Sequence, residues 1–176
     1  MKNNKTKDKS VQLLVASSAA LVLTLAGLVT YSVAANVLPT NPFYSLKTAW
    51  QNAQVALTFD PAAKSRLALQ QARARINEAR ALNNSPASQA AQTAVVPTLS
   101  RAQSALDLAL IESNKVSNAQ EREKIHSEIS KEAESAKQEA EKHVEQPELP
   151  ESEKKDAKDV SDKLDKTHQE ASKTSH

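Results

Sequence analysis

The chain has 176 residues, 23 of them Lys or Arg and 21 Asp or Glu, with a formal net charge of +2, one glycine and no cysteine. Without cysteine it can form neither disulfides nor thiolate metal sites, and so little glycine argues against tight-turned sheets and phosphate-binding loops. Basic residues prevail up to residue 100 and acidic ones after it. This asymmetry does not favour nucleic-acid binding and predicts attraction between the two halves.

Residues 1–10 form a basic leader and residues 11–35 are apolar. As a helix, Val11–Ala34 would extend about 36 Å, enough to cross a hydrocarbon core of about 30 Å. Small residues up to Ala34 and Ala35 also suit cleavage of a signal peptide. A transmembrane anchor and a cleaved signal peptide therefore both remain open. In either case the positive-inside rule keeps the leader cytoplasmic and places the rest of the chain outside the membrane.

Residues 36–146 are expected to form an all-α extracytoplasmic domain. Asn41 and Pro42 suit the cap and the first position of a helix, because proline has no N–H to leave unsatisfied there. Helical spacing predicts that this first helix buries one apolar stripe, which consists of Leu46, Trp50, Ala53 and Leu57.

Asp60 and Pro61 repeat the cap-plus-proline signal and begin a second predicted helix. The second helix carries a stripe made of Leu69, Ala72, Ile76 and Ala79, with Leu67 and Leu82 beside it. A turn is predicted at residues 83–86, where Asn-Asn-Ser-Pro interrupts the pattern.

A long third helix is predicted from this turn to about His143, with Pro97 either starting or kinking it. Its stripe begins with Leu99, Ala102, Leu106, Ala109, Ser113 and Val116 and continues more weakly through Ile125, Ile129, Ala133, Ala136 and Ala140. The expected architecture is a helical hairpin plus this long helix, in a small bundle or a coiled coil.

Residues 147–176 are predicted to be a disordered charged tail, because Val160 and Leu164 are its only large hydrophobic residues after the QPELP break. The alternative is a transient helix held by local ion pairs such as Asp159 with Lys163.

Residues 38–61 contain the only tryptophan and both phenylalanines of the chain. We interpret them as a clasp after the apolar segment, in which Pro39 and Pro42 stiffen the chain. Trp50 is expected in the core. Tyr44 is expected either in the core or, with Phe43, in the lipid headgroup layer. Lys47 is expected in solvent, with a lipid phosphate or an acidic residue of the third helix as alternative partners.

The same stretch resembles the signature of a bacterial extracytoplasmic domain family of unknown function, Leu-Pro-Gly-Asp-x-Leu-Tyr-Pro-(Leu/Val)-Lys followed by Thr-x-Asp-Pro. The matching residues are Leu38, Pro39, Tyr44, Leu46, Lys47, Leu57, Thr58, Asp60 and Pro61. Asn41 replaces the aspartate and Phe43 the leucine, while Thr40 and Ser45 depart from the pattern. The resemblance covers roughly residues 36–120.

The resemblance implies an anti-sigma-factor-like membrane protein. An anti-sigma factor needs a cytoplasmic domain to hold its sigma factor, and the leader offers only about ten residues. A partner protein in the membrane or envelope would have to supply that domain.

Arg66, Arg73 and Arg80 recur every seven residues and therefore share one helical face. We favour the interpretation that they oppose the acidic third helix. The alternative is that they bind anionic envelope polymers or lipid headgroups.

No catalytic or metal site is predicted, and no cofactor. The histidines are His126, His143, His168 and His176, and none forms an HExxH pattern or an i, i+4 pair. His126 is interpreted as part of a solvated, charged helix face, and no carboxylate pair sits in an apolar setting where its pKa would shift.

The sequence therefore predicts a membrane-anchored, non-enzymatic interaction module, sensor-like or a scaffold. The lipid bilayer, a membrane or envelope protein and a second copy of the chain are its expected partners, and nucleic acid is not. The alternative is a secreted helical protein that binds anionic envelope components.

Overall fold

The computed structural model of the chain describes residues 39, 41, 44–85 and 89–173. Within these ranges there are five α-helices and no strand. The helices are α2 (Tyr44–Ala56), α3 (Pro61–Asn83), α4 (Gln89–Ser113), α5 (Ala119–Val144) and α6 (Glu151–Lys173). The apolar segment 11–35 lies outside the described residues, and none of the described helices is long and apolar enough to cross a bilayer.

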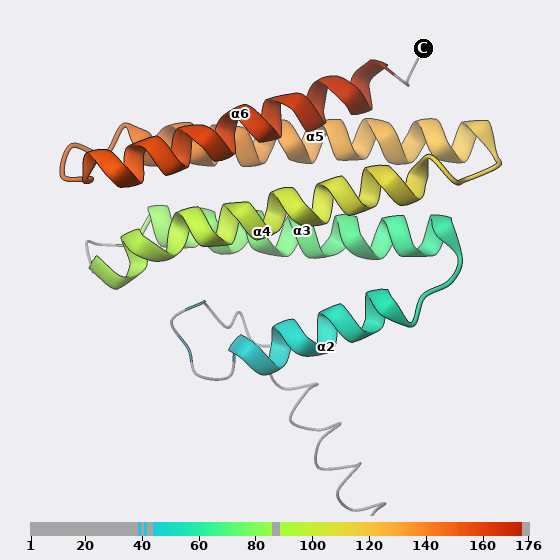
Figure 1. Cartoon of the computed structure of the whole chain (residues 1–176), viewed down its shortest axis with the longest axis horizontal. Coiled ribbons are helices and arrows are strands. Elements are labelled where there is room, and N and C mark those ends of the chain that lie inside the picture. Colours follow the sequence, from blue (N-terminus) through green and yellow to red (C-terminus); the bar gives the residue numbers. More distant parts are fainter. Residues whose placement is uncertain (1–38, 40, 42–43, 86–88, 174–176) are drawn as a thin grey trace, which may run out of the picture.

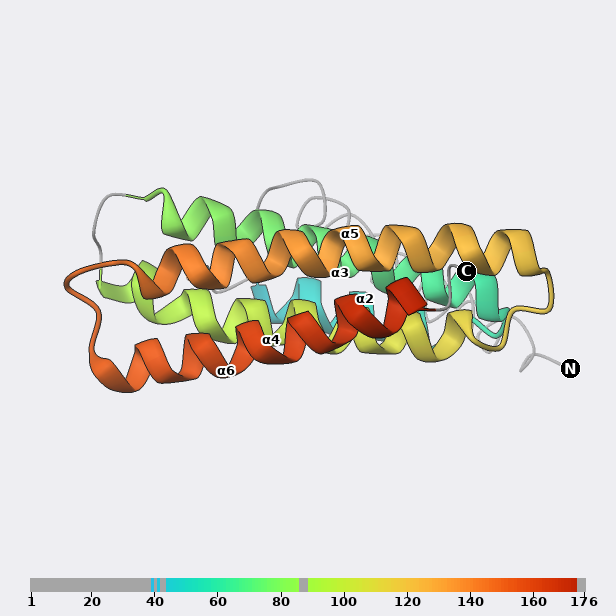
Figure 2. The same cartoon turned by 90° about the horizontal axis from the view of Figure 1, so that it is seen from above.

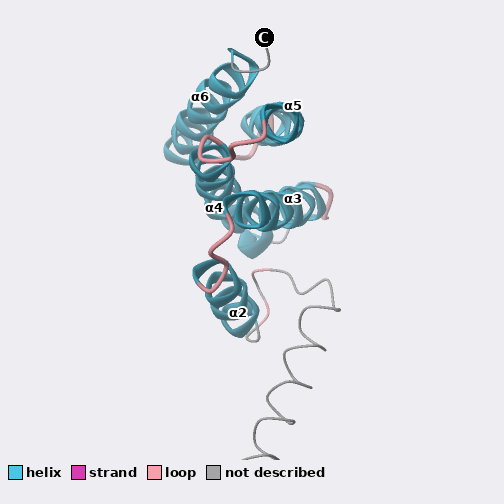
Figure 3. Ribbon diagram, turned by 90° about the vertical axis from the view of Figure 1, so that its right-hand side faces the viewer, coloured by secondary structure: helices cyan, strands magenta, loops and turns pink. Residues whose placement is uncertain are grey.

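Helices α3 to α6 form a bundle of two antiparallel hairpins, α3–α4 and α5–α6 (Figure 1). Helix α4 contacts α3, α5 and α6, whereas α3 packs on α4 and α5 (Figure 3). The axes of the four helices are roughly parallel or antiparallel to one another (Figure 2). Helix α2 lies outside this bundle, below the α3–α4 hairpin in Figure 1.

The bundle core consists mainly of alanine, with leucine and isoleucine between. Fully buried members are Ala68, Ala72, Ala79, Leu99, Ala102, Leu106, Ala109, Ile129, Ala133, Ala136, Ala140 and Leu164. The predicted stripes of residues 69–82 and 99–140 are therefore the core-facing stripes. Small side chains let helices approach closely, and each contributes little apolar area at about 25 cal/mol per Å².

Side-chain caps form at two helix starts, of which the sequence predicted the first. Asp60 accepts a hydrogen bond from the Ala63 N–H at 2.7 Å, and Pro61 follows as the first residue of α3. Asn118 does the same for α5, accepting from the Glu121 N–H at 3.1 Å. Each cap satisfies a backbone donor that the first helical turn leaves without a partner.

The prediction of one long third helix was wrong, because α4 ends at Ser113 and α5 begins at Ala119. The cap of Asn118 explains the break, since its extended backbone cannot continue α4. Pro97 lies inside α4, so it does not start the helix. Its side chain is exposed, where the missing backbone donor disturbs no packing.

The prediction of a disordered tail was also wrong, because residues 151–173 form α6. Apart from Ser161, its buried positions alternate in steps of three and four residues, through Ala157, Val160, Leu164, Thr167 and Ala171. Counting only large hydrophobic residues missed the alanines and the threonine that complete this stripe. Acidic residues in the first turn and Lys173 in the last also suit the helix dipole.

Two polar contacts hold α6 in register with its neighbours. Lys137 of α5 pairs with Asp165 at 2.7 Å, and the hydroxyl of Thr167 donates to Asp107 of α4 at 2.8 Å. Burial raises the pKa of the Asp107 carboxyl, although the bond from Thr167 opposes that shift. Helix α6 therefore belongs to the folded unit.

Candidate functional site on helix α2

Helix α2 faces the bundle with a polar side. Tyr44 and Lys47 are buried there, and both reach Glu78 of α3. The Tyr44 hydroxyl donates to Oε2 of Glu78 at 2.9 Å, and Nζ of Lys47 donates to Oε1 at 2.8 Å. A buried carboxylate thus holds two groups of α2.

Arg75 of α3 completes this buried group. Its Nη1 donates to both oxygens of Glu78, at 3.0 and 2.9 Å, and its Nη2 donates to the side chain of Gln51 on α2. Gln71 adds a bond from Nε2 to the Gln51 carbonyl at 2.7 Å. We call Tyr44, Lys47, Gln51, Arg75 and Glu78 the polar clasp.

Two guanidinium groups lie close to the Tyr44 ring. Arg75 is 5.0 Å from the ring centroid and Arg101 of α4 is 5.6 Å from it, both within cation–π range. Burial raises the pKa of Tyr44 to about 12, with a further contribution from the charge of Glu78. Tyr44 therefore stays protonated and keeps donating to Glu78 at physiological pH.

The opposite side of α2 is apolar and faces away from the bundle. At 3.6 residues per turn, the stripe Leu46, Trp50, Ala53 and Leu57 lies about half a turn from the polar clasp. Trp50 is 43% exposed, Leu57 72% and, in the loop that follows, Phe59 87%. We call Leu46, Trp50, Ala53, Leu57 and Phe59 the outer stripe.

The expectation that Trp50 packs in the core was therefore wrong, and so was the expectation that Lys47 is solvated. Helix α2 meets α3 where Arg75 and Glu78 are buried, so polar partners on α2 are needed there, while Val55 is buried further along the same side of α2. The bundle core is closed by residues of α3 to α6 without Trp50. Of the two positions considered for Tyr44, the structure shows the buried one.

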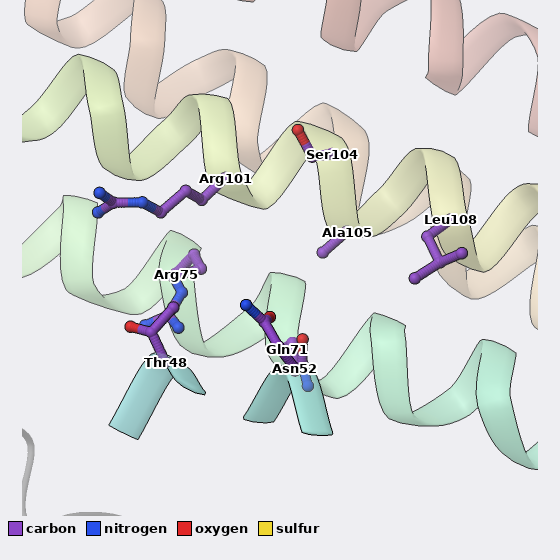
Figure 4. Close-up of a pocket in the computed structure, with 8 residues that line it drawn as sticks. All are labelled: Thr48, Asn52, Gln71, Arg75, Arg101, Ser104, Ala105 and Leu108. Carbon is purple, nitrogen blue, oxygen red and sulfur yellow. The ribbon is translucent and has the colours of Figure 1, made fainter. Parts of the chain in front are cut away.

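A cavity of about 300 Å³ lies between α2, α3 and α4 beside the polar clasp (Figure 4). One end holds Arg75 and Arg101, and the other holds Ala105 and Leu108. Thr48, Asn52, Gln71 and Ser104 complete the lining.

The arginine row faces α5. Arg66 pairs with Glu121 at 2.6 Å, Arg73 with Glu128 and Glu132 at 2.9 and 2.8 Å, and Arg80 with Glu139 at 2.7 Å. Although partial burial opposes the shift, the hydrogen bonds that Arg73 donates to Glu132 and Glu128 raise its pKa. These pairs agree with the favoured interpretation, in which the arginines oppose an acidic helix. The guanidinium groups proposed to bind envelope polymers are therefore already paired with carboxylates of α5.

The remaining residues of the signature are only partly described. Leu38, Pro42 and Phe43 lie outside the described residues. Asn41 offers its backbone carbonyl to the Tyr44 N–H at 3.0 Å, and Pro39 is half-buried beside it. Asp60 and Pro61 form the cap of α3.

The interpretation of His126 as a solvated residue was wrong, because His126 and His143 are both fully buried. Neither ring nitrogen of His126 has a hydrogen-bond partner among the described residues, nor does Nε2 of His143. Burial lowers the pKa of both imidazoles, and the charge of Arg122 adds to the effect at His126. Within the described ranges, no three metal-ligating side chains gather in one place.

Sequence reasoning missed Glu78, Arg75, Gln51 and Arg101. One signal was present, since Glu78 is the only carboxylate within α3. A lone acidic residue in so basic a helix is a natural focus for cations from neighbouring helices.

No curated protein and no solved structure matches this chain. The family described as Domain of unknown function (DUF5667) matches residues 36–132, more than half of the chain. The match includes all of α2, α3 and α4, the polar clasp and the first half of α5. The chain therefore belongs to the DUF5667 family, which confirms the expectation of an uncharacterised domain family.

Proposed function

We propose that the protein is a non-enzymatic scaffold anchored in a membrane through residues 11–35, with its helical bundle outside the cell membrane. In this function α2 lies against the bilayer surface, and the outer stripe sits in the headgroup layer. In the regulatory setting implied by the resemblance, the bundle would be the extracytoplasmic half of a two-protein sensor.

The orientation of α2 carries this proposal. An isolated soluble bundle would turn Trp50 and Leu57 inward, yet α2 turns Lys47 and Tyr44 inward instead. A helix with an uncovered apolar stripe that includes tryptophan is typical of interfacial helices. Tryptophan also favours the boundary between lipid and water.

The position of α2 in the chain supports the bilayer as the surface it meets. Only residues 36–43 separate the apolar segment from Tyr44. Eight residues span at most about 29 Å when fully extended, so an anchor would keep α2 close to the membrane.

The structure also offers support for a non-enzymatic role. The buried ionisable groups at α2 are bonded to one another, as Glu78 is to Lys47 and Arg75. Such an arrangement fixes a helix and leaves no free general base beside a reacting atom.

Because Trp50 is the only tryptophan, its fluorescence reports directly on the outer stripe. The full chain is reconstituted in vesicles whose lipids carry bromine close to the headgroups, a quencher of tryptophan at short range. We expect strong quenching of Trp50 relative to vesicles without bromine.

A matched control moves the probe. In the double variant Trp50→Phe, Ile111→Trp the tryptophan stands at an exposed position of α4, and we expect little quenching. Equal quenching at the two positions, or a chain that does not associate with vesicles, would contradict the proposal.

A further inference from the structure

The polar clasp carries more positive than negative charge. Lys47 and Arg75 are 6% and 4% exposed, and the one carboxylate that pairs with them, Glu78, is 6% exposed. Arg101 adds a third cation above the Tyr44 ring. Burial of unbalanced charge is unfavourable, and a cation–π contact offsets only part of it.

The carboxylates of the neighbouring helices are engaged elsewhere. Glu112 pairs with Lys64 and Lys115, and Asp107 accepts from Thr167 of α6. Among the described residues Arg101 has no ion-pair partner, and the cavity that it lines contains no carboxylate.

The cavity beside the clasp has the lining that an anion requires at one end. Figure 4 shows Arg101 and Arg75 together at that end, with Thr48 of α2 next to them. The side-chain amides of Asn52 and Gln71 lie further along; Asn52 supplies N–H donors, and Gln71 retains one N–H beside the bond it donates to the Gln51 backbone carbonyl. Its volume of about 300 Å³ suits a small ligand.

We propose that the cavity between α2, α3 and α4 binds a phosphate-type oxyanion, which is held by Arg101 and balances the positive charge of the clasp beside it. Arginine forms paired hydrogen bonds with phosphate oxygens, and Arg101 has both Nη groups available for them, whereas Arg75 contributes its charge while bonded to Glu78 and Gln51. Ala105 and Leu108 give the far end of the cavity an apolar lining, which would accept a short alkyl substituent on the anion.

Two sources share this chemistry, a free phosphate and the headgroup of a phospholipid. The test uses the full chain in non-ionic detergent micelles, labelled with ¹⁵N, and titrates inorganic phosphate in one arm. The other arm titrates a short-chain phosphatidic acid. The side-chain amide signals of Asn52 and Gln71 report binding at the cavity itself.

We expect saturable shifts of these signals in at least one arm. Binding in both arms at similar strength identifies a free oxyanion, and binding of the lipid alone identifies a headgroup. Absence of shifts at Asn52 and Gln71 in both arms would overturn the proposal.

Arg101→Gln is the decisive variant, because Arg101 is exposed and makes no ion pair that folding needs. We expect its dissociation constant to rise about tenfold or more, as for the loss of a charged hydrogen bond. Lys158→Gln removes the same charge from an exposed site on α6 and should leave binding unchanged. Equal affinity of the Arg101→Gln variant and the wild type would also overturn the proposal, since the anion would then bind elsewhere.

Discussion

The ammonium group of Lys47 lies 2.8 Å from Oε1 of Glu78, and both side chains are buried between α2 and α3. This pair joins the helix that follows the apolar segment to the bundle. Truncating one member of a buried ion pair leaves the other charge without a partner, which is far more unfavourable than the loss of a surface pair.

Glu78→Gln should therefore release α2 while the bundle stays folded. Breaking a buried pair costs about 3–5 kcal/mol, and here the loss falls on the attachment of α2. Hydrogen exchange measured by mass spectrometry should show faster exchange in residues 44–56 and unchanged exchange in α3 to α6. Glu123→Gln, at an exposed position of α5, is the matched control. Wild-type protection of α2 in the Glu78 variant would refute this prediction.

Charge reversal at Arg73 should lower the free energy of unfolding. Arg73→Glu removes two part-exposed ion pairs with α5 and places like charges together, so we expect a loss of about 1–2 kcal/mol. The urea midpoint of the variant measures it. Adding Glu132→Arg should recover part of the loss, and a double variant no more stable than Arg73→Glu alone would mean that the pair does not couple the helices.

Removing the imidazole of His126 should stabilise the fold. Because neither of its ring nitrogens has a partner among the described residues, His126→Leu should raise the free energy of unfolding by about 1–2 kcal/mol at pH 7. Chemical denaturation provides the measurement, with Lys124→Leu at an exposed position of α5 as control. A destabilised His126→Leu variant would instead reveal a bond to a bound water.

Acidification should destabilise the protein through its two buried histidines. Burial lowers the pKa of His126 and His143 in the folded state, so the unfolded chain binds protons that the folded chain does not. The two neutral imidazoles contribute fully to the free energy of unfolding above the ordinary histidine pKa of about 6.5. As the pH falls below that value, the free energy of unfolding decreases by at most about 1.4 kcal/mol per pH unit for each histidine. Unfolding midpoints between pH 8 and pH 5 should show the slope. The same slope in His126→Leu as in the wild type would exclude that residue as a contributor.

Helix α6 should be required for the stability of the whole bundle. Leu164 is fully buried, so Leu164→Ala should lower the free energy of unfolding by about 2–5 kcal/mol. Lys158→Ala on the exposed side of the same helix serves as the control for thermal unfolding. If the two variants melted alike, α6 would not be part of the cooperative unit.

Local signals in the sequence predicted much of the bundle. The caps of Asp60 and Pro61 and the stripe of Leu69, Ala72, Ile76 and Ala79 depend on chemistry within a few residues, and the structure has them as expected. The cap at Asn118 was missed because the apolar stripe continues beyond it. In residues 147–176 only large hydrophobic residues were weighed, which hid the alanines and the threonine of the α6 core stripe.

The candidate site could not be predicted because it depends on partners distant in sequence. Lys47 and Glu78 are 31 positions apart, and Tyr44 of α2 contacts Arg101 of α4, with the whole of α3 between them in the sequence. A pattern of apolar residues on residues 46–57 indicates a buried face but does not say what buries it. In α2 it is the polar face, with Tyr44 and Lys47, that packs against the rest of the chain.

The main apolar core cluster contains no described residue of α2, whose buried Val55 lies outside that cluster. Detachment of this helix would consequently expose Val55 and the buried charges to water and leave the main hydrophobic cluster closed. A ligand or surface that competes for Glu78 or Tyr44 would shift the balance between attached and detached α2 without unfolding anything else. If residues 11–35 anchor the chain as we propose, the segment that joins them to the bundle would then change its reach, and the bonding state of Glu78 would set the distance between bundle and membrane.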